Sequence, residues 1–339
     1  MKRLAIIGAG AAGLAAAQRL RTTRPDIDIV VLEKSRGVGG RVATRTHGEF
    51  VFDHGAQYVK APSAELEAFL ADDTLLDIGQ PVWILGADDQ ITPGDHTQNA
   101  EPKWTYRDGI THLVRNLAQG LDVRTEIRVG KLAHIGSQWE LFDGDQTSLG
   151  LFDGVLLTPP APQIRALIAA STLDATRQHA IDVALAPALY RRCLTLSLGY
   201  QQPIQRPWYA VINTDREHPI AWLAREHAKP NRAPDDHSVL VAQMAPVWSE
   251  TQWDTPLEPL TASIHTMICR ILDQELPPPM FADRQGWRYA LPDGKADGAA
   301  LNAVDDGLFW AGDYLAGQGR VHRAIETGWE AAERIAATL

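Results

Sequence analysis

Short apolar runs and an Ala-rich segment alternate at the start of the chain. Residues 4–7 are an apolar run of strand length, and residues 27–32, apolar except for Asp28, predict a second strand. The Ala-rich residues 14–20 between them predict a helix. Near the end of the chain, residues 308–311 predict a strand and residues 321–339 a long helix. These segments together predict one discontinuous α/β domain that contains both ends of the sequence.

The middle of the chain has a different pattern, with alternating strands and several tryptophans. The apolar and polar spacing predicts helices over 63–70, 109–121, 164–170 and 260–275, and strands over 82–85, 123–129, 138–142, 154–157, 194–198 and 239–242. Five of the 10 tryptophans lie between residues 208 and 287. This segment is typical of an inserted, sheet-rich domain.

Glycines between the first predicted strand and helix form the motif G-x-G-x-x-G at residues 8–13. Gly8 allows a tight turn, Gly10 lets the backbone approach a pyrophosphate, and Gly13 lets the helix and strand pack closely. Glu33 follows the second strand, 20 residues beyond Gly13 (33 − 13). It is placed to accept hydrogen bonds from an adenosine ribose. The pattern predicts a dinucleotide site at a helix N-terminus.

A second glycine cluster distinguishes between the two common dinucleotides. Residues 34–41 read K-S-R-G-V-G-G-R, directly after the predicted ribose acid. A nicotinamide dehydrogenase has no need of another close backbone approach there, whereas an extended flavin does. The cluster therefore favours FAD.

Composition and charge exclude several other functions. The 339 residues carry a net charge of −10 and have a pI near 5.5, which argues against nucleic acid as a partner. We expect no signal peptide, no membrane span and a cytoplasmic location. Cys193 and Cys269 are expected to be reduced thiols. The histidines lack metal-ligand spacing, so no metal site is predicted.

Seven motifs resemble the flavin-containing amine oxidase superfamily, and within it the renalase-like branch. Besides the two glycine motifs they are F-D-H-G-A-Q-Y at 52–58, T-P-P-A-P-Q at 158–163, W-L-A-R-E-H-A-K-P-N-R at 222–232, W-R-Y-A at 287–290 and A-G-D-Y-L-A-G-Q-G-R-V at 311–321. The resemblance covers nearly the whole chain. It implies an α/β fold in which a discontinuous Rossmann-type FAD-binding domain (residues 1–60, 104–165 and 297–339) carries an inserted α+β substrate domain (61–103 and 166–296).

The resemblance also implies which residues hold FAD, which we expect to be non-covalently bound. The expected cofactor-binding residues are Gly8, Gly10, Ala12, Gly13, Glu33, Lys34, Gly39, Gly40, Arg41, Gly55, Ala56, Gln57, Val129, Gly312, Asp313, Arg320 and Val321. The turn at residues 55–58 is expected near the isoalloxazine. The helix N-terminus at Arg320 and Val321 is expected at the flavin N1–C2=O edge, where it would stabilise negative charge.

The branch is associated with oxidation of aberrant dihydronicotinamide dinucleotides, the 2- or 6-dihydro forms of NAD(P). Hydride passes to flavin N5, and O2 reoxidises the flavin to give H2O2. The catalytic candidates are the pocket-wall residues Gln57, Tyr58, Trp222, Trp287 and Tyr289. Arg225 and Lys229 are candidates for the substrate phosphates. The expected partners are a small hydride donor and O2, with the protein a monomer or weak homodimer.

Departures from the branch keep other functions open. Glu226 is a change that would repel a phosphate or attract an amine, and His322 alters the charge near the flavin. The alternatives are an FAD-dependent amine oxidase, a non-catalytic flavin-binding protein and other desaturase-like chemistry. Trp222 and Trp287 are alternatively core residues. His54 is a turn residue in preference to a catalytic one. Lys295 is a solvated turn residue in preference to the lysine that amine oxidases place near the flavin.

Overall fold

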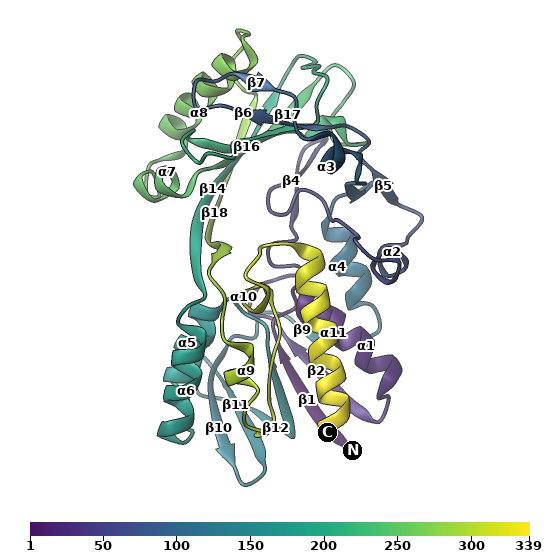
Figure 1. The fold of residues 1–339 in the computed structure, drawn as a ribbon, viewed down its shortest axis with the longest axis vertical. Helices are drawn as coiled ribbons and strands as arrows, with labels where there is room; N and C mark the ends of the chain where they lie inside the picture. The colour runs from purple at the N-terminus through teal and green to yellow at the C-terminus, as the bar shows by residue number, and fades with distance from the viewer. The chain divides into compact units, whose positions relative to one another are not determined.

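The computed structural model describes residues 1–339, which divide into two compact units (Figure 1). Unit 1 comprises residues 1–42, 113–190 and 291–339, and unit 2 comprises residues 43–112 and 191–290. Each unit is built from segments that are distant in sequence. No helix is long and apolar enough to span a membrane.

Unit 1 is built on a parallel sheet of five strands. Its order is β19 (Leu308–Trp310), β13 (Gly154–Leu157), β1 (Lys2–Ile7), β2 (Ile27–Leu32) and β9 (Asp122–Arg124). The central strands are buried apolar runs, as parallel sheets covered on both faces require. A three-stranded antiparallel sheet also belongs to unit 1: β10 (Val129–Ile135), β11 (Gln138–Asp143) and β12 (Ser148–Phe152).

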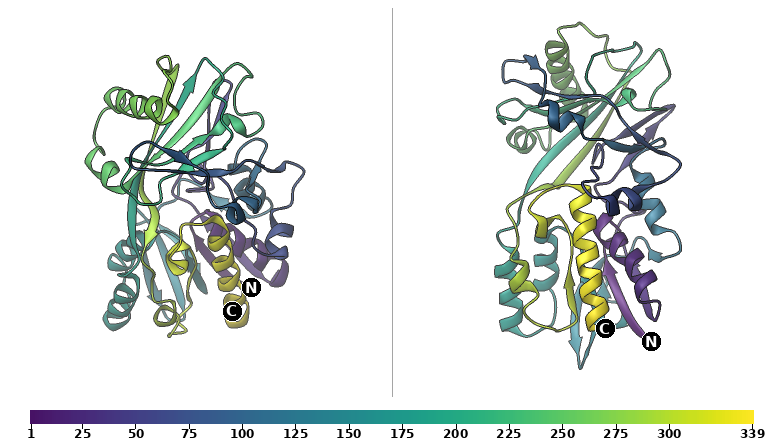
Figure 2. Two further views of the ribbon diagram at one scale, coloured as in Figure 1. Left: turned by 45° about the horizontal axis from the view of Figure 1, so that its top comes forward. Right: turned by 45° about the vertical axis from the view of Figure 1, so that its right-hand side comes forward.

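Two long helices of unit 1 lie side by side, α1 (Ala11–Thr23) and α11 (Val321–Thr338), as the views in Figures 1 and 2 agree. A Cβ on Gly328 would lie only 2.3 Å from the carbonyl oxygen of Ala12, so the two backbones are in close contact. The other helices of unit 1 are α5 (Ala161–Ala169), α6 (Ala175–Leu185), α9 (Gly298–Leu301) and α10 (Asp313–Ala316). The helix α4 (Thr111–Ala118) begins in unit 2 and ends in unit 1.

Unit 2 is built on a seven-stranded sheet. Its order is β18 (Phe281–Asp293), β14 (Leu189–Tyr200), β17 (Ser238–Met244), β16 (Ile220–Arg225), β15 (Ala210–Ile212), β6 (Val82–Leu85) and β7 (Ile91–Thr92). One face packs its leucines against α8 (Leu257–Leu272), which lies across that face in Figure 1. Because successive side chains of a strand point to opposite faces, the alternate residues form a second face.

Smaller elements complete unit 2. They are the hairpin β3 (Thr44–His47) and β4 (Phe50–Asp53), the pair β5 (Leu75–Asp77) and β8 (Trp104–Tyr106), and the helices α2 (Ala64–Leu70), α3 (His96–Ala100), α7 (Pro246–Thr251) and η1 (Glu226–Ala228). Phe50 and Phe52 of the hairpin pack on Val239, Val241 and Phe281 of the large sheet.

Most of the predicted elements are confirmed, several to the residue. The strands over 27–32, 82–85 and 154–157 have the predicted bounds, and Ser63 caps α2 by accepting a hydrogen bond from the Leu66 N–H. The single strand predicted over 123–129 is wrong. Glu126 has a φ of +60°, which breaks the chain into β9 and β10 of two different sheets. The sequence patterns also missed α6, whose N-cap is Asp174.

The boundaries of the compact units differ from the predicted domain boundaries. Residues 43–60 and 104–112 belong to unit 2, because the β3–β4 hairpin packs on its sheet and the Val51 N–H donates to the Arg232 carbonyl. Residues 166–190 and 291–296 belong to unit 1, where α5 and α6 pack in its core. The assignment of cofactor and substrate binding to the predicted segments stays a prediction.

The close contact between α1 and α11 generates a test of stability. We expect Gly328→Ala to lower the free energy of unfolding by about 1–3 kcal/mol, because the added methyl forces the helices apart. Gly144→Ala is the matched control, since a Cβ there meets nothing within 4 Å. Denaturant unfolding of the two variants measures the difference. Equal stabilities would contradict close contact at Gly328.

Candidate functional site

The glycine loop of unit 1 connects β1 to α1 in a conformation that excludes larger side chains. Gly8 has a φ of +105°, and a Cβ on Gly13 would lie 2.2 Å from the Gly8 carbonyl oxygen. Thr158, at the end of β13, donates from Oγ1 to the Ile7 carbonyl at 2.8 Å. A Cβ on Gly10, by contrast, would meet nothing within 4 Å. The backbone at Gly10 is therefore open to a ligand.

The N-terminus of α1 has no side-chain cap. Its N-cap residue is Gly10, in an extended conformation, and the first turn contains Ala12 and no acidic side chain. Uncapped N–H groups and the helix dipole favour an anion at this position. A pyrophosphate fits these properties.

Glu33 lies directly beside the glycine loop and is only 7% exposed. Its Oε2 accepts from the Ala9 N–H at 2.9 Å, and its Oε1 accepts from the Ser35 N–H at 2.8 Å. A carboxylate oxygen accepts more than one hydrogen bond, so both retain capacity for ribose hydroxyls. The chain that leads to Val129 passes alongside, with the Ile127 N–H donating to the Glu33 carbonyl.

The second glycine cluster is tied to the first. The Gly39 N–H donates to the Ala9 carbonyl at 2.8 Å, and Gly10 and Gly39 form an isolated parallel bridge. A Cβ on Gly40 would again meet nothing within 4 Å. Lys34 is exposed and donates from Nζ to Gln163 Oε1 at 2.9 Å. The structure thus brings two open glycines, Gly10 and Gly40, into the same loop cluster.

Asp313 is nearly buried at the start of α10 and is held by two side chains. Arg41 Nη2 donates to its Oδ1 at 2.9 Å, and the Tyr190 hydroxyl donates to the same oxygen at 2.6 Å. Burial, together with the Asp313 carboxylate, raises the pKa of the Tyr190 hydroxyl above its usual range. The structure thus pairs Arg41 with Asp313, two residues that the motifs assign separately to the cofactor, and Tyr190 is a partner that the sequence patterns missed.

The N-terminus of α11, like that of α1, has no side-chain cap. Its N-cap residue is Arg320, in an extended conformation and without a side-chain cap, and Val321 is the first helical residue. Gly312 precedes Asp313, and its N–H donates to Thr327 Oγ1 at 3.0 Å. Two uncapped helix ends, an acidic residue and open glycines all belong to unit 1, and together they fit a dinucleotide cofactor.

The predicted catalytic residues all belong to unit 2. On β16 and β17, Trp222 and Gln243 are paired residues on the sheet face opposite α8. Gln243 Nε2 donates to the Gly55 carbonyl at 2.7 Å, so the turn 53–58 lies on this face. Ala56 is half-buried in the same turn.

Trp287 of β18 contacts the other side of the turn. Its Nε1 donates to the His54 carbonyl at 3.0 Å, and its indole stacks on the His54 ring with centroids 5.4 Å apart. Tyr289 has the same side-chain parity on β18 as Trp287. These contacts identify Trp287 as part of the face that holds the turn.

Gln57 is buried in the turn and bonded at both ends of its amide. Its Nε2 donates to the Asp53 carbonyl, and its Oε1 accepts from the Tyr209 hydroxyl at 3.4 Å. Half-buried Tyr58 and Trp222 have ring centroids 6.1 Å apart, and Tyr209 and Trp222 are also 6.1 Å apart. The structure thus brings Gln57, Tyr58 and Trp222 together with Tyr209.

The expected role of Arg225 and Lys229 as phosphate ligands is wrong for the structure described here. Arg225 is 4% exposed, and its guanidinium donates to the carbonyls of Trp208 and Ile204 and to Gln80 Oε1. Lys229 is 1% exposed and is paired with carboxylates. Both cations are used inside the unit and are not available to a substrate.

Glu226 is also internal, which corrects the expectation that it would repel or attract a substrate. It is fully buried and paired with Lys229 and Arg232. His54 is 5% exposed, and burial, together with Arg45, lowers its pKa to about 4 despite the nearby Asp53 carboxylate. The imidazole is therefore neutral at neutral pH. None of the predicted catalytic residues on the face around the turn has a charged side chain.

The remaining candidates, Lys295 and His322, belong to unit 1. Lys295 is an exposed residue of unit 1. His322 is nearly buried in the first turn of α11. The described chain contains no group of three or more His, Cys, Asp or Glu side chains arranged to hold a metal ion.

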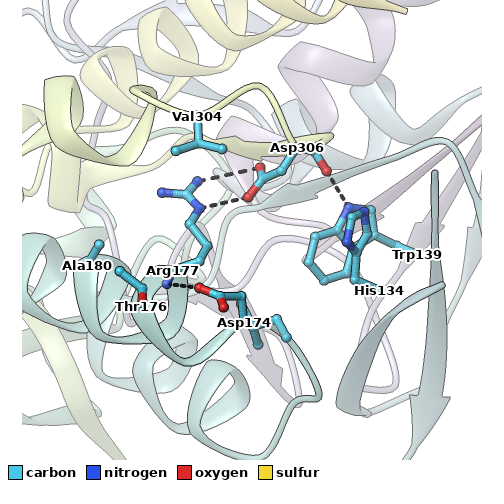
Figure 3. Close-up of a pocket in the computed structure, with 9 residues that line it drawn as sticks. His134, Trp139, Asp174, Thr176, Arg177, Ala180, Val304 and Asp306 are labelled. Carbon is cyan, nitrogen blue, oxygen red and sulfur yellow. Dashed lines mark hydrogen bonds and ion pairs between the residues drawn. The ribbon is translucent and has the colours of Figure 1, made fainter. Parts of the chain in front are cut away.

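A cavity of about 420 Å³ in unit 1 is lined by none of the predicted site residues (Figure 3). Its polar groups are satisfied by one another: Arg177 pairs with Asp306 at 2.7 Å, the Trp139 indole donates to the Asp306 carbonyl, and Asp174 caps α6. With its polar groups so engaged, this cavity is a poor candidate for catalysis.

Sequence patterns missed four residues that the structure places in these groups, namely Thr158, Tyr190, Tyr209 and Gln243. Thr158 was visible within the T-P-P-A-P-Q motif. Tyr190, Tyr209 and Gln243 have no local signal, because their partners are more than 100 residues distant.

Comparisons with known proteins agree with this fold. A protein from Exiguobacterium sp. 255-15 proposed to be a protoporphyrinogen oxidase superposes with a TM-score of 0.80 at 17% identity, covering 100% of this chain and 99% of the other. Cyclohexylamine oxidase from Brevibacterium oxydans IH-35A superposes with a TM-score of 0.76 at 14% identity, and a redesigned putrescine oxidase with 0.74 at 15%; both alignments cover 99% of each chain. These likenesses show a shared fold.

Family matches cover most of the sequence. Residues 6–72 match the NAD(P)-binding Rossmann-like domain, the part that contains both glycine motifs and Glu33. Residues 68–336 match the flavin containing amine oxidoreductase family. The chain thus belongs to the flavin containing amine oxidoreductases and is an FAD-dependent oxidoreductase with a Rossmann-type domain.

Proposed function

We propose that this chain is an oxidase that holds FAD non-covalently and takes a hydride from the carbon next to nitrogen in a small, uncharged amine. The observation that carries the proposal is the neutral aromatic and amide face of unit 2, formed around Gln57, Tyr58 and Trp222. Such a surface favours an uncharged, partly apolar donor. Arg225 and Lys229 are buried and are therefore not available to bind a phosphate there.

The proposed cofactor residues are those of unit 1 together with the turn at Gly55, Ala56 and Gln57. The uncapped N-terminus of α1 would bind the pyrophosphate and Glu33 the ribose. The backbone at Arg320 and Val321 would stabilise negative charge on the flavin. When bound, FAD supplies a hydride acceptor and passes the two electrons to O2, which yields H2O2.

The chain's own side chains then have modest tasks. Tyr58, Trp222, Trp287 and Tyr289 would exclude water and orient the donor carbon. An apolar surface also disfavours a protonated amine, so the neutral amine, which is the hydride donor, would be the bound form. Gln57 would keep the turn in place through its bonds to the Asp53 carbonyl and Tyr209.

A dihydronicotinamide is the second candidate, favoured by the motifs shared with the renalase-like branch. Its reduced ring is neutral and planar, which suits aromatic side chains. The dinucleotide forms also carry a pyrophosphate, and the two cations expected to bind it are internal. We therefore place the amine first. The oligomeric state and the cytoplasmic location stay predictions.

Loss of the Glu33 charge should weaken cofactor binding. We expect Glu33→Gln to raise the Kd for FAD about 10- to 150-fold, because a charge-assisted hydrogen bond contributes about 1.5–3 kcal/mol. Titration of the apoprotein with FAD, followed by flavin fluorescence, measures the Kd. Glu330→Gln, on the exposed side of α11, is the control and should leave it unchanged. An unchanged Kd in Glu33→Gln would remove Glu33 from the cofactor site.

The reductive half-reaction distinguishes the candidate substrates. We expect small primary or secondary amines to bleach the visible flavin band under anaerobic conditions, and 2- or 6-dihydronicotinamide dinucleotides to bleach it more slowly. Rapid bleaching by the dinucleotides alone would establish the second candidate instead. Flavin that stays oxidised with every donor would indicate a non-catalytic flavin-binding protein.

Trp222 should act on substrate binding, since it lies on the neutral face. We expect Trp222→Leu to raise KM about 3- to 10-fold with little change in kcat, because an aromatic contact contributes about 0.5–1.5 kcal/mol. Trp253→Leu is the matched control, because Trp253 packs on the α8 side of the sheet. Steady-state kinetics test both variants. Equal effects on KM would show that Trp222 is a core residue.

A further inference from the structure

Behind the turn of unit 2 lies a cluster of four fully buried charged side chains. Asp53 is the last residue of β4, Glu226 begins η1, and Lys229 and Arg232 follow η1. The side chains of all four have 0% exposure. Lys229 Nζ lies 2.8 Å from Asp53 Oδ2 and 2.9 Å from Glu226 Oε1. Arg232 Nη2 donates to Asp53 Oδ2 at 3.2 Å.

Asp53 uses its other oxygen to join two more segments of unit 2. Its Oδ1 accepts from the Thr44 hydroxyl at 2.6 Å and from the Ile110 N–H at 2.9 Å. Its own backbone N–H donates to Glu226 Oε1 at 3.1 Å. The first residue of the turn is thus fixed at both its backbone and its side chain by the cluster.

The cluster continues through neighbouring groups to the proposed substrate face. The Asp53 carbonyl accepts from Gln57, whose Oε1 accepts from the Tyr209 hydroxyl. Lys229 Nζ lies 5.6 Å from the centre of the Tyr209 ring, and that ring contacts Trp222 edge-on. A displacement of the cluster would therefore be transmitted to Gln57 and Trp222.

Stability alone gives little reason for such a cluster. Buried ion pairs commonly contribute no more than well-packed apolar residues, because both charges lose their water. Here Arg232 Nη1 and Glu226 Oε2 also lack hydrogen-bond partners, although Oε2 lies 2.9 Å from Lys229 Nζ. What the four charges do provide is a defined position for the backbone of Asp53.

We propose that Asp53 and Glu226 are positioning residues that, through Lys229 and Arg232, set the place of the turn 53–58 and so tune substrate binding on the neutral face without touching the substrate. This inference rests on the proposed function for its substrate. The titratable and charged groups that face Glu226 are Asp53 of β4, Lys229 and Arg232 after η1, and Tyr209 of β15.

Protonation distinguishes the two acids. Burial raises the pKa of Glu226 to about 7, against the lowering by Lys229 and Arg232, whereas those two cations hold the pKa of Asp53 at about 2 despite its burial. Glu226 binds a proton in the folded state at pH 6 that it lacks in the unfolded state. The stability that this proton provides is lost as the pH rises through 7.

The isosteric variant Glu226→Gln tests the proposal, since glutamine copies the protonated acid. We expect the Tm of the wild type, relative to that of Glu226→Gln, to fall between pH 6 and pH 8. Glu258→Gln, on the exposed first turn of α8, is the matched control and should show a pH-independent difference. A wild-type minus Glu226→Gln difference in Tm that is the same at both pH values would overturn the role of Glu226.

Positioning has a separate readout that a purely structural role would not affect. We expect the ratio of the wild-type KM to the Glu226→Gln KM to change at least threefold between pH 6 and pH 8, since protonation of the amine itself affects both proteins equally, with similar flavin spectra. Amide hydrogen exchange of residues 53–58 in Asp53→Asn should rise at least tenfold while β14 stays protected. Equal pH dependence of KM in both proteins, or unchanged exchange, would overturn the proposal. If no donor is oxidised, the proposed function fails, and the Tm and exchange measurements still test whether the cluster fixes the position of the turn.

Discussion

Close backbone approach around α1 is the constraint on which unit 1 depends. Gly13 lets the helix lie against the Gly8 carbonyl, and Gly328 lets α11 lie against the Ala12 carbonyl. A side chain at either glycine would push one helix away from its neighbour. Since the N-termini of α1 and α11 have no side-chain cap, the same packing that stabilises the unit also determines where these two positive helix ends lie.

Unit 2 depends on a different constraint. Residues 54–58 of its turn belong to no helix or strand, so side-chain bonds must hold the turn in position. Glu226, Lys229 and Arg232 hold Asp53. Gln243 and Trp287 donate to the carbonyls of Gly55 and His54, and Gln57 bonds back to the Asp53 carbonyl. All these bonds are used within the protein. The charged residues of the 222–232 motif are likewise paired inside unit 2, and the aromatic side chains of Tyr58 and Trp222 are half-buried beside the turn.

Local patterns predicted the fold class and the bounds of many elements well. Residues 154–157 form a short apolar run that is buried along its whole length, and the Ser63 cap satisfies an N–H of its own helix. The strand predicted over 123–129 was wrong because a single residue, Glu126, adopts a positive φ in a segment of suitable composition. Tertiary pairing into two sheets decided that break, and it leaves little trace in the local pattern.

The sequence by itself determined the family, the glycine loop and Glu33, since their spacing follows from the local geometry of a strand, a turn and a helix. Only the tertiary structure decided which charges are available to a ligand. From the sequence, Arg225, Glu226 and Lys229 have the composition expected of a charged binding site on the surface. Each is instead buried against a partner distant in the chain: Arg225 against Gln80, and Glu226 and Lys229 in the cluster around Asp53. Burial and pairing depend on those distant segments, and the motif that contains the three residues does not specify them.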